Sequence, residues 1–301
     1  GVDELILDSY PRMLAALESE VRNFRPHIVH AHHYNENLVA AVLRRTRAFP
    51  FYVNGHHYSD HIYYLTRGWK RKLLLAAEGL CNTIAGKIVV PSGGVARLLV
   101  ERQGVPKEKV VAIPYGVPLN VLKPTSAHAA SDIRSLHGLQ DKFVALTCCR
   151  LNREKGLQYL VEAVPNLVRR QPQFRLVLVG TGPFEPELRR KCRLLGIEDT
   201  VLFMGWQDRA MDWIDAADLV LQPSLCESFC QVLAEALALA KPMIMTPVGA
   251  APDVIGNNER GRLVPPADSA ALEKTIIELM SDAALRQRLG VLGRNYVREN
   301  L

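Results

Sequence analysis

From residue 142 onward, short apolar runs alternate with longer segments in which apolar residues recur at helical spacing. Such runs are typical of buried parallel strands, and they lie at 142–149, 174–180, 200–205, 219–224, 242–246 and 261–265. The segments between them, and the stretch from Asp268, are typical of amphipathic helices. Strands that alternate with helices predict a doubly wound parallel sheet, in which ligands bind beyond the carboxyl ends of the strands.

The first part of the chain repeats this pattern less completely. It has strand candidates at 27–32, 51–56, 87–92 and 109–116, with helical segments between them. Residues 118–140 lack a strong periodicity and are predicted to form a linker. We therefore expect two α/β domains, residues 1–122 and residues 123–301. No strand precedes the opening helix, and the chain stops within helical sequence, so we expect the first domain to be incomplete and the second to lack its final helix.

Composition excludes several classes of protein. Hydrophobic residues make up 48% of the 301 residues and charged ones 23%, so a disordered chain is excluded. Six cysteines without a C-x-x-C pair exclude a disulfide scaffold. No apolar run approaches the roughly 18 residues that span a bilayer, and the acidic opening segment does not resemble a signal peptide. We expect a reduced, cytoplasmic protein, with a peripheral position at the inner face of the membrane as the alternative.

The positive charge of the chain lies entirely in its first part. Residues 1–125 contain 16 Lys and Arg against 10 Asp and Glu, whereas residues 126–301 contain 21 of each. The segment 61–75 places Tyr63, Tyr64 and Trp69 among four basic residues, a composition typical of helices that lie on membranes. This predicts an anionic membrane surface as a partner, with an ordinary solvated helix as the alternative. No nucleic-acid-binding motif is present, and we expect no nucleic-acid partner.

Two carboxylates mark the stretch 226–242, CESFCQVLAEALALAKP. If Glu227 and Glu235 belong to one helix, they lie roughly 12 Å apart along its axis. That separation exceeds the roughly 5–10 Å of a glycosidase pair but suits the two ends of an elongated polar ligand. Glu235, within an apolar run, needs hydrogen-bond donors such as sugar hydroxyls. The alternative is that Glu227 caps the helix and Glu235 faces solvent.

A basic motif, R-L-N-R-E-K-G at 150–156, directly follows the predicted strand 142–149. Cations at the carboxyl end of a parallel strand, followed by glycine and a helix, suit a diphosphate. An ordinary basic loop is the alternative. By contrast, Gly180-Thr-Gly182 lacks the third glycine of a dinucleotide fingerprint and predicts a strand-to-helix turn.

Together these motifs resemble the retaining nucleotide-sugar glycosyltransferases of family 4. That family has the GT-B fold, in which two Rossmann-like domains face a cleft. The resemblance runs from Pro26 to Asn300 and includes R-x4-K-G at 150–156 and E-x7-E at 227–235. It also includes G-T-G-P at 180–183, A-D-L-V-L-Q-P-S at 217–224, A-K-P at 240–242, T-P-V-G at 246–249 and G-R-L-V-P-P-A-D at 261–268. The resemblance implies that the donor binds the second domain and the acceptor the first.

The resemblance also implies the roles of individual residues. Arg150 and Lys155 would neutralise the donor diphosphate, Glu227 would contact the donor sugar and Glu235 the ribose. Backbone N–H groups at the start of the following helix would help to hold sugar and phosphate, and they belong to Ser228, Phe229 and Cys230.

In the first domain, His56 matches the family histidine near the donor sugar, and His32 matches a less constant position. Two cysteines depart from the family pattern, because Cys149 and Cys230 stand where glycine is usual. The glycine-rich loop of the first domain is absent from the sequence, which puts the activity of this chain in question.

The expected function is transfer of a sugar, of hexosyltransferase type, from a nucleotide-diphosphate donor to an acceptor hydroxyl with retention of configuration. We expect no cofactor and no bound metal, although seven of the nine histidines lie between residues 27 and 61. The expected acceptor is a lipid or a lipid-linked sugar. The alternatives are a noncatalytic nucleotide-sugar-binding or scaffold protein and a GT-B nucleotide-sugar epimerase.

Overall fold

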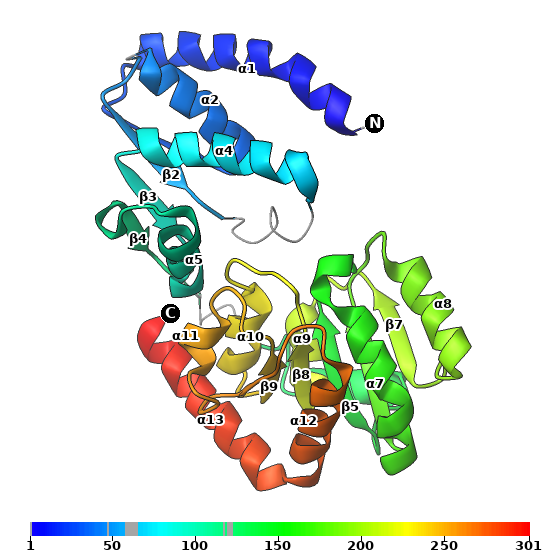
Figure 1. The fold of residues 1–301 in the computed structure, drawn as a ribbon. Helices are drawn as coiled ribbons and strands as arrows, with labels where there is room; N and C mark the ends of the chain where they lie inside the picture. The colour runs from blue at the N-terminus through cyan, green and yellow to red at the C-terminus, as the bar shows by residue number, and fades with distance from the viewer. Residues whose placement is uncertain (1, 47, 58–65, 117, 119–122) are drawn as a thin grey trace. The chain divides into compact units, whose positions relative to one another are not determined.

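The chain forms two α/β units, Gly1–Pro114 and Tyr115–Leu301, in a computed structural model (Figure 1). The structure describes residues 2–46, 48–57, 66–116, 118 and 123–301. It divides the chain after Pro114, ahead of the predicted boundary at 122/123. No helix among the described residues is long and apolar enough to cross a membrane.

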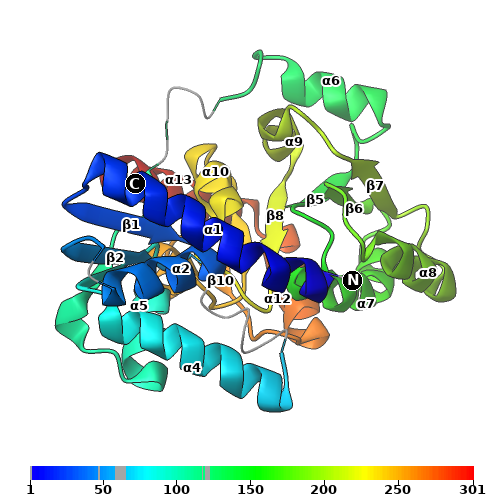
Figure 2. The same cartoon turned by 90° about the horizontal axis from the view of Figure 1, so that it is seen from above.

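The first unit contains a parallel sheet with the strand order β1-β2-β3-β4. Each of its four predicted strand segments contains one observed strand: β1 (Ile28–His32), β2 (Phe51–Gly55), β3 (Lys87–Val90) and β4 (Val110–Ala112). The helices described in this unit are α1 (Val2–Phe24), α2 (Tyr34–Arg45), α4 (Gly68–Ile84) and α5 (Gly93–Gln103). Helices α2 and α4 lie side by side in both views (Figures 1 and 2). Leu43, Tyr52, Ile88 and Leu99 lie at the centre of the core that these elements enclose.

The second unit contains a parallel sheet with the strand order β10-β9-β8-β5-β6-β7. Its strands are β5 (Phe143–Cys148), β6 (Phe174–Val179), β7 (Val201–Gly205), β8 (Leu219–Gln222), β9 (Met243–Met245) and β10 (Arg262–Leu263). Its helices are α6 (Ala129–Leu136), α7 (Leu157–Arg170), α8 (Glu185–Leu195), α9 (Ala210–Ala216), α10 (Gln231–Ala238), α11 (Ala251–Ile255), α12 (Ser269–Ser281) and α13 (Ala283–Asn300).

Helices cover both faces of this second sheet. Because side chains alternate along a strand, Ala145 of β5 packs into the core under α7, α8 and α12, whereas Val144 and Leu146 pack into the core under α9, α10 and α11. A sheet buried on both faces needs continuous apolar strands, which is the pattern in the sequence. The predicted doubly wound parallel sheet is therefore confirmed.

The prediction of a linker at 118–140 is wrong in part, because α6 lies within that stretch. The guanidinium of Arg134 fixes this helix by donating hydrogen bonds to the backbone oxygen of Ala216 and to Asp218, at 2.8 Å each. Helix α6 also packs against α9. This short helix depends on partners distant in the sequence, so local periodicity does not reveal it.

Candidate functional site

The residues predicted to bind the donor follow strands β5 and β8, the two neighbouring strands at which the strand order of the second sheet reverses. From β5 the chain continues to β6 and β7 on one side of the sheet, and later to β8, β9 and β10 on the other. Strands β5 and β8 are direct neighbours, and the loops after them contain Lys155 and Glu227. Ligands of open α/β sheets bind at such a switch point, so the topology brings the predicted residues to the expected place.

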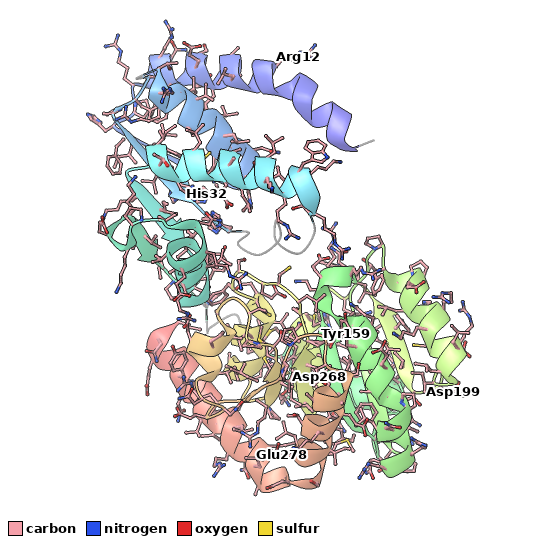
Figure 3. The ribbon with its side chains drawn as sticks, viewed as in Figure 1. Arg12, His32, Tyr159, Asp199, Asp268 and Glu278 are labelled. Atoms are coloured by element: carbon pink, nitrogen blue, oxygen red, sulfur yellow. The ribbon has the colours of Figure 1, made fainter. Side chains whose placement is uncertain are left out.

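The loops after β5 and β8 touch each other through a glycine. Gly156 has a φ of 69°, and a Cβ atom built on it would lie 1.9 Å from the backbone oxygen of Pro223. The amide of Leu225 also donates to the backbone oxygen of Glu154, at 2.7 Å. Tyr159, labelled in Figure 3, lies in the first turn of α7 and donates its amide to the oxygen of Gly156. The loop that contains Lys155 is therefore held against the loop that contains Glu227.

Lys155 and Glu227 form an ion pair between these two loops. The Lys155 Nζ donates to Oε1 of Glu227 at 2.7 Å, and Ser224 Oγ donates to the same oxygen at 2.8 Å. Burial opposes the charge of Lys155, but its pKa is raised above the ordinary value because the Glu227 carboxylate attracts and hydrogen-bonds the ammonium. The pair is thus a charged, largely buried unit. Ser224 belongs to it although the sequence analysis did not single it out.

Arg150 differs from Lys155 in its surroundings. Its side chain is exposed, and no described residue forms a hydrogen bond or ion pair with its guanidinium. All the N–H groups of its guanidinium are therefore available to a ligand, and the planar arrangement of these donors matches a phosphate. Of the two predicted phosphate-binding cations, Lys155 is thus paired and Arg150 is unpaired among the described residues.

Glu227 does not lie on the helix that contains Glu235, so the separation of roughly 12 Å along one helix axis does not apply to them. Helix α10 begins only at Gln231, and Glu227 belongs to the loop before it. Cys230 precedes the helix with φ 72° and ψ 90°. That conformation is left-handed and favours glycine, the residue that the family pattern has there, and it interrupts the helix between the two carboxylates.

Glu235 is half-buried in α10. Burial raises the pKa of its carboxyl group. No described residue donates a hydrogen bond to this carboxylate. The described residues therefore do not supply the hydrogen-bond donors that we expected for a carboxylate within an apolar run.

Ser228 and Phe229 continue the loop before α10. The Phe229 side chain is buried against Tyr115, with ring centroids 5.0 Å apart. Phe229 therefore helps to fix the loop in the core, and only its backbone remains for the predicted role of holding sugar and phosphate.

Two thiols border the ion pair. Burial raises the pKa of the Cys149 thiol to about 12, and burial together with the Glu227 carboxylate raises that of Cys230. Both thiols are therefore protonated at neutral pH. They act as small side chains that adjoin Lys155 and Glu227, at the positions where the family has glycine.

His56 lies inside the first unit and not on its surface. Its side chain is fully buried, and Nε2 lies 3.2 Å from Oε1 of Glu78. Burial lowers the pKa of His56 to about 3 and raises that of Glu78 to about 7. Burial thus disfavours the charged form of both groups. The expectation that His56 reaches a donor sugar stays a prediction.

Four other histidines lie together where β1 and β2 end: His30, His32, His33 and His57 (Figure 3 labels His32). Nδ1 of His32 and Nε2 of His57 share a hydrogen bond of 2.7 Å. Burial and the neighbouring imidazoles lower the pKa of His57. Within the described ranges, no group of three or more His, Cys, Asp or Glu side chains has the arrangement to hold a metal ion.

The predicted membrane segment 61–75 is described in part. Tyr63 and Tyr64 lie outside the described residues, whereas Trp69 and the basic residues lie in α4 and at its start.

Comparison with known proteins covers both units. The model of the family described as glycosyl transferases group 1 matches residues 131–296, and that of the glycosyl transferase 4-like domain matches residues 5–116. A D-inositol 3-phosphate glycosyltransferase of Streptomyces avermitilis is 31% identical over 218 residues, which cover 68% of this chain and 47% of that protein. An N-acetyl-alpha-D-glucosaminyl L-malate synthase of Bacillus anthracis is 36% identical over 145 residues, or 48% of this chain and 38% of that protein. The chain spans about half the length of the first curated relatives.

Solved structures agree on the fold. HepE of Anabaena, crystallised with UDP and glucose, matches with a TM-score of 0.85 and 22% identity over 96% of this chain and 77% of that one. Sucrose-phosphate synthase from Thermosynechococcus elongatus matches with a TM-score of 0.83 and 26% identity over 98% and 75%. The predicted fold class, GT-B with two Rossmann-like parallel-sheet domains, is confirmed.

Proposed function

Because the chain belongs to the group 1 glycosyl transferases, we propose that it transfers a sugar from a nucleotide-diphosphate donor to an acceptor hydroxyl. The second unit binds the donor in this proposal. The single observation that supports it most is the joined pair of loops at the switch point, which places Lys155 and Glu227 2.7 Å apart and Arg150 nearby in the sequence. The cations Arg150 and Lys155 suit the diphosphate of a nucleotide sugar, and the carboxylates Glu227 and Glu235 suit its hydroxyl groups.

The cations act on the leaving group. As the bond between the anomeric carbon and the diphosphate oxygen breaks, negative charge grows on the departing nucleoside diphosphate. Lys155, as a point charge, and Arg150, as a planar donor, stabilise that charge without the need for a metal ion in this proposal. The acceptor oxygen forms the new bond to the anomeric carbon, and its proton passes to the departing diphosphate oxygen.

The carboxylates bind hydroxyl groups. Glu227, with Lys155 and Ser224 on one of its oxygens, accepts hydrogen bonds from the donor sugar. Glu235 accepts them from the ribose, which supplies the donors that the described residues do not. The backbone N–H groups of Ser228, Phe229 and Cys230 contribute further donors at the start of α10.

The finer features of the reaction come from the resemblance to family 4. We propose retention of the anomeric configuration, a hexose as the transferred sugar, and a role for His56 close to that sugar. The proposed acceptor is a lipid or a lipid-linked sugar.

A ligand screen on the 301-residue chain tests the donor assignment. UDP-, GDP- and ADP-sugars are added in turn, and the midpoint of thermal unfolding is measured. A ligand at a hundred times its dissociation constant stabilises the native state by about 2.7 kcal/mol. Stabilisation by one nucleotide class, lost in Lys155→Ala, is the expected result. No stabilisation by any of them would contradict the proposal, and binding without transfer would favour a noncatalytic nucleotide-sugar-binding protein.

A further inference from the structure

Helix α4 (Gly68–Ile84) has its large apolar side chains on the side that faces away from the core of the first unit. Trp69 is 70% exposed, Leu73 61% and Leu80 51%, and Ala76 is exposed between them. At 100° per residue these four positions lie within about 40° of Trp69 and extend over about 16 Å of the helix. They form a continuous apolar stripe, which we call the outer face of α4.

The inner face of the same helix carries polar side chains beside the apolar Cys81, which belongs to the core of the unit. Glu78 and Asn82 are buried there, and both contact Gln103, which donates to Glu78 at 2.9 Å and accepts from Asn82 at 3.0 Å. Asn54 of β2 donates to Asn82 at 2.8 Å. A surface helix normally turns its large apolar side chains toward the core, whereas Trp69, Leu73 and Leu80 of α4 are exposed. Packing within the unit therefore does not explain the apolar outer face.

Basic side chains border the outer face on both sides. Lys70 and Lys72 are exposed, as is Arg67 at the start of the helix, and Nζ of Lys70 lies 6.0 Å from the centre of the Trp69 ring. The one carboxylate of α4, Glu78, lies on the buried side. The exposed surface of this helix is thus apolar and positively charged, without an acidic residue of its own.

We propose that the outer face of α4 docks on an anionic lipid bilayer, with the helix in the plane of the interface. Trp69, Leu73 and Leu80 enter the boundary between headgroups and acyl chains, and Lys70 and Lys72 contact the anionic headgroups. An apolar stripe with tryptophan and flanking lysines is the composition of helices that lie on membranes. A protein partner would meet the same stripe, but an acidic bilayer matches both its apolar and its basic parts.

This docking is independent of the proposed transfer reaction. If both hold, the unit that the resemblance assigns to the acceptor lies on the surface where a lipid-linked acceptor would be found. Loss of donor binding would contradict the proposed function and leave the docking untouched, so the two can fail separately.

Co-sedimentation of the 301-residue chain with vesicles tests the electrostatic part. Vesicles of equal parts phosphatidylcholine and phosphatidylglycerol are compared with vesicles of phosphatidylcholine alone, at low and high salt. Binding is expected only to the anionic vesicles and is expected to fall with salt. Lys70→Gln with Lys72→Gln should weaken it about 25-fold, since each basic residue contributes about fivefold. Arg45→Gln with Lys107→Gln, two exposed charges elsewhere in the first unit, is the matched control and should change it far less.

A second pair of variants tests the apolar part. Leu73→Ser with Leu80→Ser should abolish the binding that remains at high salt, whereas Leu136→Ser with Leu194→Ser, at exposed leucines of the second unit, should not. Lipids with brominated acyl chains should quench the fluorescence of the wild type but not of Trp69→Phe. Equal binding to neutral vesicles, or equal losses in test and control variants, would overturn the proposal. So would a dimer in solution that dissociates in Leu73→Ser with Leu80→Ser while vesicle binding persists.

Discussion

The ammonium of Lys155 lies 2.7 Å from the carboxylate of Glu227, although 72 positions separate them in the sequence. The loops that contain them follow neighbouring strands, β5 and β8. The close contact of Gly156 with Pro223 holds those loops together. In the proposed reaction this pair links the group that stabilises the diphosphate to the group that binds the sugar.

Lys155→Ala should lower the rate of sugar transfer by about 10²–10³-fold, because it removes a cation directed at the charge of the leaving group. Arg150→Lys should also lower the rate, since the planar donor is lost. Single-turnover transfer by the 301-residue chain, with the enzyme in excess over the donor, measures both. Lys142→Ala, a lysine at the amino end of β5, is the control. Rates near that of the wild type in the two test variants would refute the diphosphate assignment.

The contribution of the Lys155–Glu227 ion pair to the stability of the protein can be measured separately from its role in transfer. Lys155→Met leaves Glu227 largely buried without its cation and should lower the free energy of unfolding by about 2 kcal/mol, somewhat less than for a fully buried pair. Adding Glu227→Gln should restore part of that loss, with a coupling of about 1 kcal/mol. Urea unfolding of the two single variants and the double variant measures the coupling. Strictly additive losses would show that the pair does not act as a unit.

Gly156→Ala should destabilise the second unit by about 3 kcal/mol or more. The new methyl group would meet the oxygen of Pro223 at 1.9 Å, and the φ of 69° is unfavourable for alanine. Gly196 is the matched control, because its φ is 64° and nothing lies within 4 Å of the place that a methyl group would take there. Gly196→Ala should therefore cost only about 1 kcal/mol, the conformational part. Equal losses would contradict the close approach of the two loops.

Cys230→Gly should be more stable than Cys230→Ala by about 1 kcal/mol. Both variants lack the sulfur, so their difference isolates the strain of a left-handed residue at φ 72°. Thermal or urea unfolding of the pair measures it. An alanine variant as stable as the glycine variant would argue against the left-handed conformation at this position.

His56 and Glu78 should give opposite contributions to the pH dependence of stability. Between pH 4.5 and about 7, native Glu78 binds a proton that the unfolded chain releases, so its contribution to stability falls as the pH rises. Between pH about 3 and 6.5, native His56 lacks a proton that the unfolded chain binds, so its contribution falls as the pH decreases. The two effects oppose each other where the windows overlap.

Glu78→Gln should remove the contribution of Glu78 to the pH dependence of stability and leave that of His56. The stability of the wild type relative to this variant should therefore fall from pH 4.5 to 7 with a slope that approaches one proton. Urea unfolding across this range measures it, with Glu101→Gln, at an exposed position of α5, as the control. A difference that does not change with pH would show that Glu78 is already ionised in the native state.

Much of the fold could be predicted because strands and helices of a doubly wound unit have local patterns. Each predicted strand segment contains an observed strand, and the G-T-G-P turn lies between β6 and α8 as expected. The motif around Lys155 was recognisable because a basic loop directly follows a strand. Helix α6 was missed because Arg134 and the contact with α9 stabilise it more than its own periodicity does.

The sequence by itself determined the parallel-sheet architecture, the family and the two short motifs with Lys155 and Glu227, since apolar periodicity and motif spacing are local properties. Only the tertiary structure decided that Glu227 precedes its helix, that it pairs with Lys155, and that His56 is buried against Glu78. Those facts depend on which strands become neighbours and on which side chains are removed from water. Contacts between residues distant in the chain set both, and no local pattern encodes them.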